Sequence, residues 1–202
     1  MVRSICFTGH RHIVRTELPA LLKELRRVLE TAIPQGFVDF YAGGALGWDT
    51  YCAQTVLDLR EEYPCIALHL VLPCSRGEQT ARWTEAQKAA YDCIFREADS
   101  CEFVSEEYTK SCMRLRNQRL VELADCCVCF CGEPEGRSGT AQTVRMAREK
   151  GIRLSIWHRE IQKPRRRDVA FLRMERDAQF RAAAFSFRRN SRRNSQRTSG
   201  PM

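Results

Sequence analysis

Two glycine-rich segments carry the residue types of an anion-binding site. The first, YAGGALGWDTYCA, contains Gly43, Gly44 and Gly47, and the carboxylate of Asp49 follows at once. Glycine adopts positive φ without strain, and backbone N–H groups at the start of a helix attract anions. The segment therefore predicts a turn that holds a phosphate and leads into a helix.

The second segment, GRSGT, contains Gly136, Ser138, Gly139 and Thr140 directly before another helical stretch. Its two hydroxyl groups add donors to those of the backbone, so it predicts the stronger phosphate cradle of the two. Two such turns suit one extended ligand better than either turn alone. Neither contains the Gly-Lys-Ser/Thr of a Walker A loop, and no GxGxxG directly follows the first strand, so a standard NAD-binding fold is not supported.

Four further residues stand where the same ligand could reach them. Gly9 and Arg11 come directly after the first strand-like run, and Arg116 and Asn117 lie early in a later helical stretch. A guanidinium pairs with a phosphate as a bidentate fork, and an asparagine amide can contact a phosphate or a base edge. We therefore expect these four residues to contact the ligand, with the two arginines neutralising its charge.

Asp49 has more than one role open to it. As an N-cap it would accept backbone N–H groups of its helix, and as a ligand contact it would accept hydrogen bonds from ribose hydroxyls. Asp49 and Glu78 are also the candidates for a catalytic acid, and the sequence does not place either in the fold. Trp48, Trp83 and Tyr108 could each stack on a base or fill the core.

The hydrophobic pattern predicts the strands and helices that position the candidate site residues. Short apolar runs predict strands, and the stretches between them have the apolar spacing of helices. The predicted strands are Ser4–Phe7, Phe37–Tyr41, Ile66–Leu72, Cys101–Val104, Cys126–Cys131 and Arg153–Ile156. The predicted helices are Glu17–Thr31, Asp49–Glu62, Glu78–Ala98, Met113–Ala124 and Thr140–Lys150. This alternation predicts an α/β fold, a mostly parallel sheet with helices on both faces, whose ligands bind at the carboxyl ends of the strands.

Charge divides the chain at about residue 160. Residues 161–202 hold 12 Lys/Arg and three Asp/Glu, whereas residues 1–160 are nearly neutral, with a net charge of −1. We predict a folded domain over residues 1–160 and a basic C-terminal extension over residues 161–202, helical at first and then disordered. The domain gives no electrostatic argument for nucleic acid. The extension leaves open weak binding to nucleic acid, an anionic surface or a protein partner.

The eleven cysteines do not predict a disulfide framework, because the count is odd and a chain of 202 residues is long enough to build a core. Strand alternation would place Cys127, Cys129 and Cys131 on one face and Cys126 on the other. That is a poor zinc cage, so we expect no metal site. Reduced thiols, no apolar run of about 20 residues and no signal-peptide pattern lead us to expect a cytoplasmic protein without a membrane span.

Five motifs occur in a fixed order along the chain: CFTGHR (6–11), AGGALGWDTYCA (42–53), LVLPC (70–74), CMRLRNQRLVELAD (112–125) and GRSGTAQTVRMAREKGI (136–152). Together they resemble the YpsA-like family of the SLOG superfamily, named for its Smf/DprA and LOG branches. The resemblance covers residues 3–157. It implies a Rossmann-like, doubly wound domain that binds or senses a nucleotide or a nucleotide-derived small molecule. No cofactor is expected, and a homo-oligomer stays open.

LOG-branch enzymes, to which the chain is also similar, cleave a base from a ribose 5′-monophosphate and carry a motif similar to PGGxGTxxE. Gly136, Gly139 and Thr140 match that motif, but Thr143 occupies the position of its catalytic Glu. A hydroxyl cannot act as the general base or stabilise an oxocarbenium ion as a carboxylate does. We therefore favour binding, with Thr143 among the contacts. A nucleotide-processing hydrolase or transferase and a nucleic-acid-associated protein acting through its extension are the alternatives.

Overall fold

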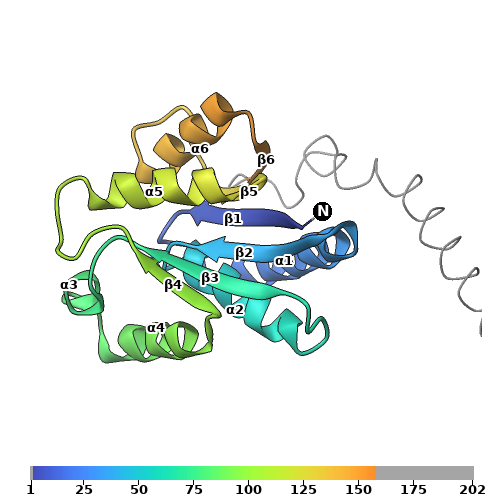
Figure 1. Cartoon of the computed structure of the whole chain (residues 1–202), viewed down its shortest axis with the longest axis horizontal. Coiled ribbons are helices and arrows are strands. Elements are labelled where there is room, and N and C mark those ends of the chain that lie inside the picture. The colour runs from blue at the N-terminus through green and yellow to red at the C-terminus, as the bar shows by residue number, and fades with distance from the viewer. Residues whose placement is uncertain (1, 158–202) are drawn as a thin grey trace, which may run out of the picture.

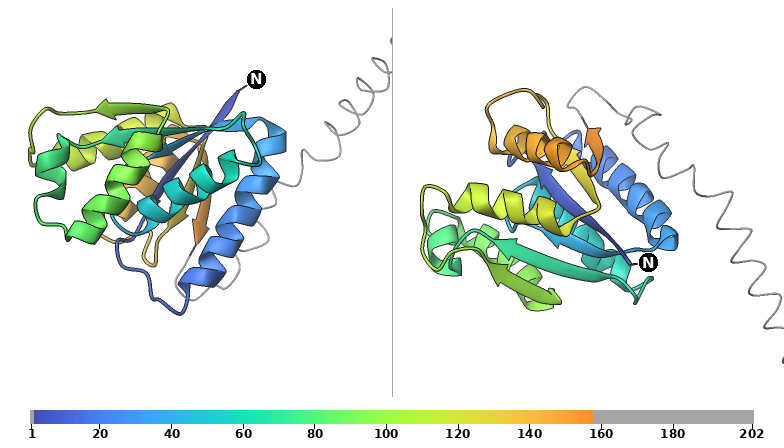
Figure 2. Two further views of the ribbon diagram at one scale, coloured as in Figure 1. Left: turned by 90° about the horizontal axis from the view of Figure 1, so that it is seen from below. Right: turned by 45° about the horizontal axis from the view of Figure 1, so that its top comes forward.

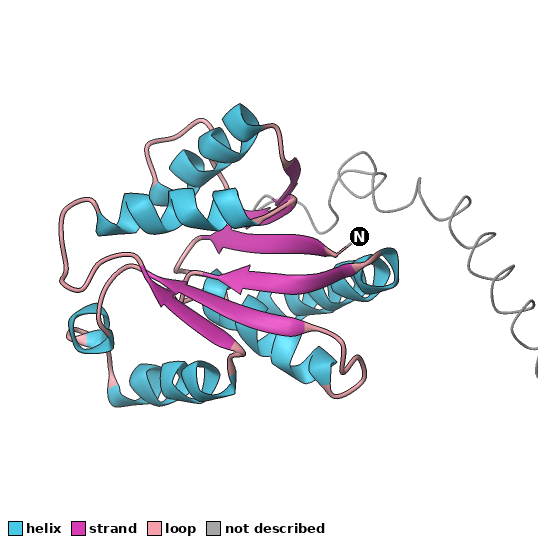
Figure 3. Ribbon diagram, in the orientation of Figure 1, coloured by secondary structure: helices cyan, strands magenta, loops and turns pink. Residues whose placement is uncertain are grey.

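Six parallel strands form the sheet of this protein, in a computed structural model that describes residues 2–157 (Figure 1, Figure 3). The strands are β1 (Arg3–Gly9), β2 (Phe37–Ala42), β3 (Ala67–Leu72), β4 (Ser100–Phe103), β5 (Cys126–Phe130) and β6 (Arg153–Trp157). Their order across the sheet is β4-β3-β2-β1-β5-β6, and every neighbouring pair is parallel. The chain thus winds outward in both directions from β1. The predicted α/β fold is confirmed.

Helices cover both faces of the sheet (Figure 2). Helices α1 (Leu18–Ala32) and α2 (Trp48–Arg60) pack on one face, and α5 (Cys112–Leu123) and α6 (Gly139–Lys150) pack on the other. The shorter elements are η1 (Ile33–Gln35) and α3 (Arg76–Thr80), and α4 (Glu85–Glu97) packs beside α2. No helix within residues 2–157 is long and apolar enough to cross a membrane.

The core consists of two apolar clusters, one on each face of the sheet. Cys126 belongs to the cluster under α1 and α2, whereas Cys127, Cys129 and Cys131 lie with Cys6 in the cluster under α5 and α6. This division confirms the alternation predicted for the cysteine-rich strand. All eleven cysteines are free thiols, and eight of them are buried, so here they serve as small apolar side chains.

The predicted helix Glu78–Ala98 is wrong in one respect, because the structure divides this stretch into α3 and α4. Thr84 caps α4: its side chain accepts the N–H of Gln87, and the side chain of Gln87 accepts the N–H of Thr84. This reciprocal pair is a capping box, which starts a new helix wherever Thr-x-x-Gln precedes an apolar face. The predicted C-terminal extension, residues 161–202, lies outside the described residues.

A row of side chains fastens the edge strand β4 to the rest of the sheet. The imidazole of His69 on β3 lies 2.7 Å from Ser100 Oγ on β4 and 3.1 Å from Asp39 Oδ1 on β2. Tyr41 on β2 stacks on the same ring, with 4.8 Å between centroids. Three strands are thereby joined through one side chain on the face that carries α5.

Candidate functional site

The carboxyl ends of β1 and β5 open into a cleft at the place where the strand order reverses. Ligands of doubly wound folds bind at this point, because the loops leaving the two strands diverge there. The cleft has a volume of about 310 Å³. Eight of the predicted contact residues line it: Gly9, Arg11, Asp49, Arg116, Asn117, Ser138, Gly139 and Thr140. Segments from four parts of the chain are thus brought together as the sequence suggested.

The N-terminus of α6 forms one wall of this cleft. Ser138 is the N-cap residue, and its hydroxyl oxygen accepts the N–H of Ala141 at 3.1 Å. Gly139 and Thr140 follow as the first helical residues, whose N–H groups have no partner within a helix. A Cβ built on Gly139 would meet nothing closer than Asn117 Nδ2 at 3.9 Å, so the space in front of these groups is open. This end of α6 presents the arrangement that binds phosphate in other proteins.

Arg116 and Asp49 form a buried ion pair in the floor of the cleft. Arg116 Nη1 lies 3.0 Å from Asp49 Oδ2, and the two side chains are only 9% and 3% exposed. The N–H of Ala45 also donates to Asp49, at 3.5 Å. Burial raises the pKa of the Asp49 carboxyl, and the neighbouring guanidinium opposes this rise by favouring the charged form.

Of the roles left open for Asp49, the N-cap of α2 is not the one that it takes. The N-cap residue is Gly47, with φ of 80°, and Asp49 lies within the first turn. Its carboxylate turns back toward the Gly43–Gly47 segment and toward Arg116, where it gains a full positive charge as partner instead of one N–H group. The anion that the first glycine-rich turn holds in this structure is therefore the carboxylate of the chain itself.

The glycines of that turn make room for other parts of the protein. A Cβ on Gly43 would lie 1.6 Å from Arg116 Nη1, and a Cβ on Gly47 would lie 2.3 Å from the carbonyl oxygen of Arg11. Gly44 and Gly47 also have positive φ, of 64° and 80°. On β1, a Cβ on Gly9 would meet the indole of Trp48 at 2.4 Å. Only glycine fits at these positions, and the reason is contact within the protein.

The buried guanidinium of Arg116 is not saturated by its carboxylate partner. Only Nη1 donates to Asp49, and Nε is buried without a hydrogen-bond partner in the described part of the chain. A buried guanidinium with an unused donor is costly unless something else accepts it. Because Arg116 lines the cleft, this observation points to an acceptor-rich ligand there.

Five predicted contact residues do not line the cleft: Gly43, Gly44, Gly47, Gly136 and Thr143. Thr143 is fully buried, and its hydroxyl donates to the carbonyl oxygen of Gly139 at 3.0 Å. It therefore supports the first turn of α6 from behind. Conversely, Thr8, His10 and Met113 line the cleft but were not predicted as contacts. Only their position in the chain, close to the predicted contacts Gly9, Arg11 and Arg116, could have indicated them.

A second cleft, of about 470 Å³, adjoins the first. The two share Arg11, Ala45, Met113 and Arg116 in their linings. The second contains Glu78, whose carboxylate accepts the backbone N–H of Tyr108, and it also contains Trp83. Of the three aromatic residues considered for stacking, Trp48 is a fully buried core residue, whereas the other two line this cleft.

Known proteins are similar to this chain in sequence and in fold. The YspA SLOG family matches residues 6–155. A UPF0398 protein of Bacillus pumilus is 29% identical over 133 residues, which cover 61% of this chain and 70% of the relative, and one of Bacillus cereus is 28% identical over 131 residues, or 64% and 70%.

Two solved structures have the same fold. DNA processing protein A (DprA) from Streptococcus pneumoniae has a TM-score of 0.56 at 18% identity, over 86% of this chain and 56% of that one. TM1055 has a TM-score of 0.50 at 15% identity, over 76% and 72% of the two chains. At these identities the likeness concerns the fold alone.

Proposed function

Since this chain belongs to the YspA SLOG family, whose model matches residues 6–155, we propose that it binds a nucleotide or a nucleotide-derived small molecule and acts as a sensor of it. The observation that carries this proposal is that the buried Arg116, whose guanidinium has spare donors, lines the same cleft as the N-terminus of α6. A phosphate between the two would receive charge-assisted hydrogen bonds from one side and backbone N–H groups from the other.

Each lining residue has a defined part in this proposal. The N–H groups of Gly139 and Thr140 and the hydroxyl of Ser138 donate to the phosphate, and Arg116 and Arg11 balance its charge. Asn117 is 6% exposed and its Nδ2 lies 3.4 Å from the carbonyl oxygen of Gly139, so it braces the phosphate wall from α5. Asp49 acts through Arg116, because their ion pair fixes the direction in which the guanidinium points.

Gly139 provides a matched pair of variants to test the phosphate site. The open space in front of it accepts a side chain without a clash, so both Gly139→Ala and Gly139→Asp should fold. The aspartate would place a carboxylate where the phosphate binds. Losing charge-assisted hydrogen bonds there lowers affinity about 10- to 150-fold.

The measurement is calorimetric titration with AMP, GMP, CMP and UMP, together with mass spectrometry of small molecules that co-purify with the protein. We expect at least one nucleotide to bind wild type and Gly139→Ala similarly and Gly139→Asp far more weakly. Equal binding to both variants would show that the N-terminus of α6 is not the phosphate site.

Cleavage of an N-glycosidic bond is the second candidate function, and one observation favours it: each cleft contains an acid. Asp49 is committed to Arg116, whereas Glu78 is exposed and bonded to a backbone N–H of the loop that precedes α5. Glu78 is therefore the better acid for a reaction. Chromatography of nucleotides incubated with wild type and Glu78→Gln tests this, since release of free base by wild type alone is expected of a hydrolase.

A further inference from the structure

The second cleft is continuous with the phosphate site. Four residues line both, and Arg11 and Arg116 are the two that carry charge. A ligand that extends beyond its phosphate past Arg116 therefore enters the second cleft. Its lining combines aromatic rings with cationic groups, whereas the first cleft holds mainly backbone and hydroxyl donors.

Tyr108 is the most exposed aromatic side chain of this lining. It is 58% exposed, so its ring is accessible to a ligand in the cleft. Two hydrogen bonds hold its loop in place: the N–H of Tyr108 donates to Glu78, and the N–H of Ser75 donates to the carbonyl oxygen of Glu106 at 3.3 Å. The ring is presented from an anchored backbone beside α3.

Trp83 stands in the same lining and is fixed by packing. Its ring meets that of Tyr91 edge to face, with centroids 5.5 Å apart and planes at 87°. Tyr91 is only 5% exposed and itself stacks on Phe95 at 6.1 Å. The indole of Trp83 is therefore already fixed before a ligand binds, so ligand binding costs little of its side-chain entropy.

The charged side chains of the second cleft also favour a planar, electron-rich group on the ligand. Arg82 and Arg11 share the lining with a single acid, Glu78, whose carboxylate is already engaged by a backbone N–H. Guanidinium groups donate hydrogen bonds to ring nitrogens and carbonyl oxygens, and they stack on aromatic faces.

From these observations we infer that the second cleft is a ring-binding subsite, in which a heteroaromatic base of the bound nucleotide stacks on Tyr108 beside Trp83. This inference rests on the proposed phosphate site. It assigns the base of the proposed nucleotide to a place in the fold. Sugar phosphates would fill the first cleft and leave the second empty.

The test compares two ligands that differ by the base alone: ribose 5-phosphate and whichever nucleoside monophosphate binds best. Stacking of a base on an aromatic side chain changes affinity about 5- to 150-fold. We expect wild type to prefer the nucleotide by such a factor in calorimetric titration. Tyr108→Ala should remove that preference without weakening ribose 5-phosphate, and Tyr108→Phe should keep it.

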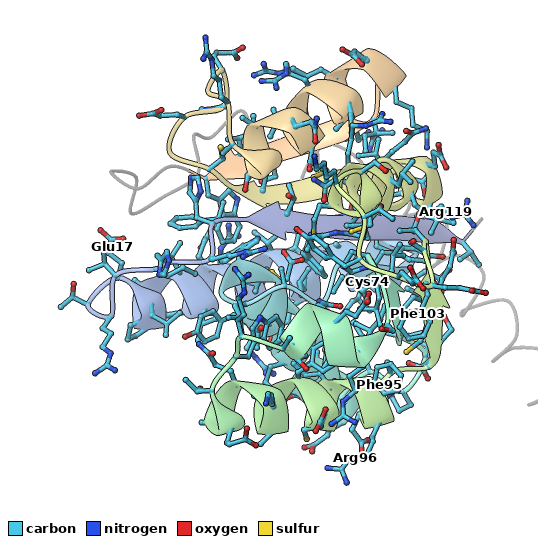
Figure 4. All side chains as sticks on the ribbon, turned by 90° about the vertical axis from the view of Figure 1, so that its left-hand side faces the viewer. Glu17, Cys74, Phe95, Arg96, Phe103 and Arg119 are labelled. Atoms are coloured by element: carbon cyan, nitrogen blue, oxygen red, sulfur yellow. The ribbon has the colours of Figure 1, made fainter. Side chains whose placement is uncertain are left out.

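Phe103 is the matched control, because it is also an exposed aromatic residue, at 43%, and lines neither cleft. It lies on β4 next to Phe95, on the side of the molecule seen in Figure 4. Phe103→Ala should therefore bind both ligands as wild type does. Circular dichroism of each variant confirms that it is folded.

Three results would overturn the inference. If the two ligands bind wild type equally, the base gains nothing from the second cleft. If Tyr108→Ala weakens both ligands equally, the ring does not contact the base. If neither ligand binds wild type, the phosphate site itself is refuted, and the ring subsite falls with it; this outcome is distinct from the other two.

Discussion

Removing the carboxylate of Asp49 tests the central assumption about the site, namely that its ion pair with Arg116 holds the cleft in shape. Asp49→Asn keeps the size of the side chain and leaves the guanidinium buried without a counter-charge. With the pair only 9% and 3% exposed, solvent screens it little. Breaking one partner of such a pair costs about 3–5 kcal/mol.

That loss is large compared with the stability of a domain, which is about 5–15 kcal/mol. In urea, where small proteins lose about 1–3 kcal/mol per molar denaturant, the unfolding midpoint should fall by roughly 1–5 M. Combining Asp49→Asn with Arg116→Met removes both charges and keeps an apolar chain of similar length. We expect this double variant to recover most of the lost stability, because an apolar replacement of a whole buried pair is about neutral or better.

Arg119→Ala supplies the control. Its ion pair with Glu102 has side chains 40% and 44% exposed, and pairs of this kind contribute about 0–1 kcal/mol. If Asp49→Asn moves the midpoint no further than Arg119→Ala does, or if the double variant is less stable than the single one, the buried pair does not have the role assigned to it. The double variant, in which Arg116 is replaced, should also lose nucleotide binding.

Three further outcomes are expected. Gly43→Ala should displace the Arg116 guanidinium and weaken nucleotide binding about tenfold or more. Gly77→Ala is the control, because its Cβ would meet nothing within 4 Å, and it should bind the nucleotide as wild type does. If Gly43→Ala binds the nucleotide as tightly as Gly77→Ala, the steric argument is refuted. Ser138→Ala and Thr84→Ala should each cost about 0.5–2 kcal/mol as lost caps, seen in thermal unfolding, but only the former should weaken nucleotide binding. A thiol reagent at pH 8 should modify Cys65, Cys93 and Cys101 quickly and all eleven thiols only in denaturant. Because burial raises the pKa of Cys74 to about 11 and of Cys126 to about 12, the unfolded chain loses these protons first, so the free energy of unfolding should fall as the pH rises above about 9.

Much of the fold follows from local patterns of the sequence. All six strands were predicted with ends within two residues of those observed, because Val, Ile, Phe and Cys concentrate in short runs between amphipathic stretches. The loops that leave the strands lie at one edge of the sheet, since parallel strands send all their carboxyl ends there, and the cleft opens among these loops. The glycine-rich GRSGT segment forms a capped helix N-terminus in the cleft, as its residue types suggest.

What the sequence did not reveal are contacts between distant segments. Asp49 and Arg116 are 67 residues apart and lie on helices of opposite sheet faces, so the sequence left the role of the aspartate open. The glycines near Asp49 indicated correctly that other atoms approach the backbone closely. Glycine alone does not show whether those atoms belong to a ligand or to the protein. The division between α3 and α4 was readable from Thr84 and Gln87, but the apolar spacing on either side obscured it.

The ion pair described above also joins helices on the two faces of the sheet. Asp49 belongs to α2 on one face, and Arg116 belongs to α5 on the other. If the proposed ligand draws the guanidinium toward its phosphate, we expect the interaction that holds α2 to weaken. Occupancy of the cleft would then be visible in amide exchange along a helix on the far side of the sheet.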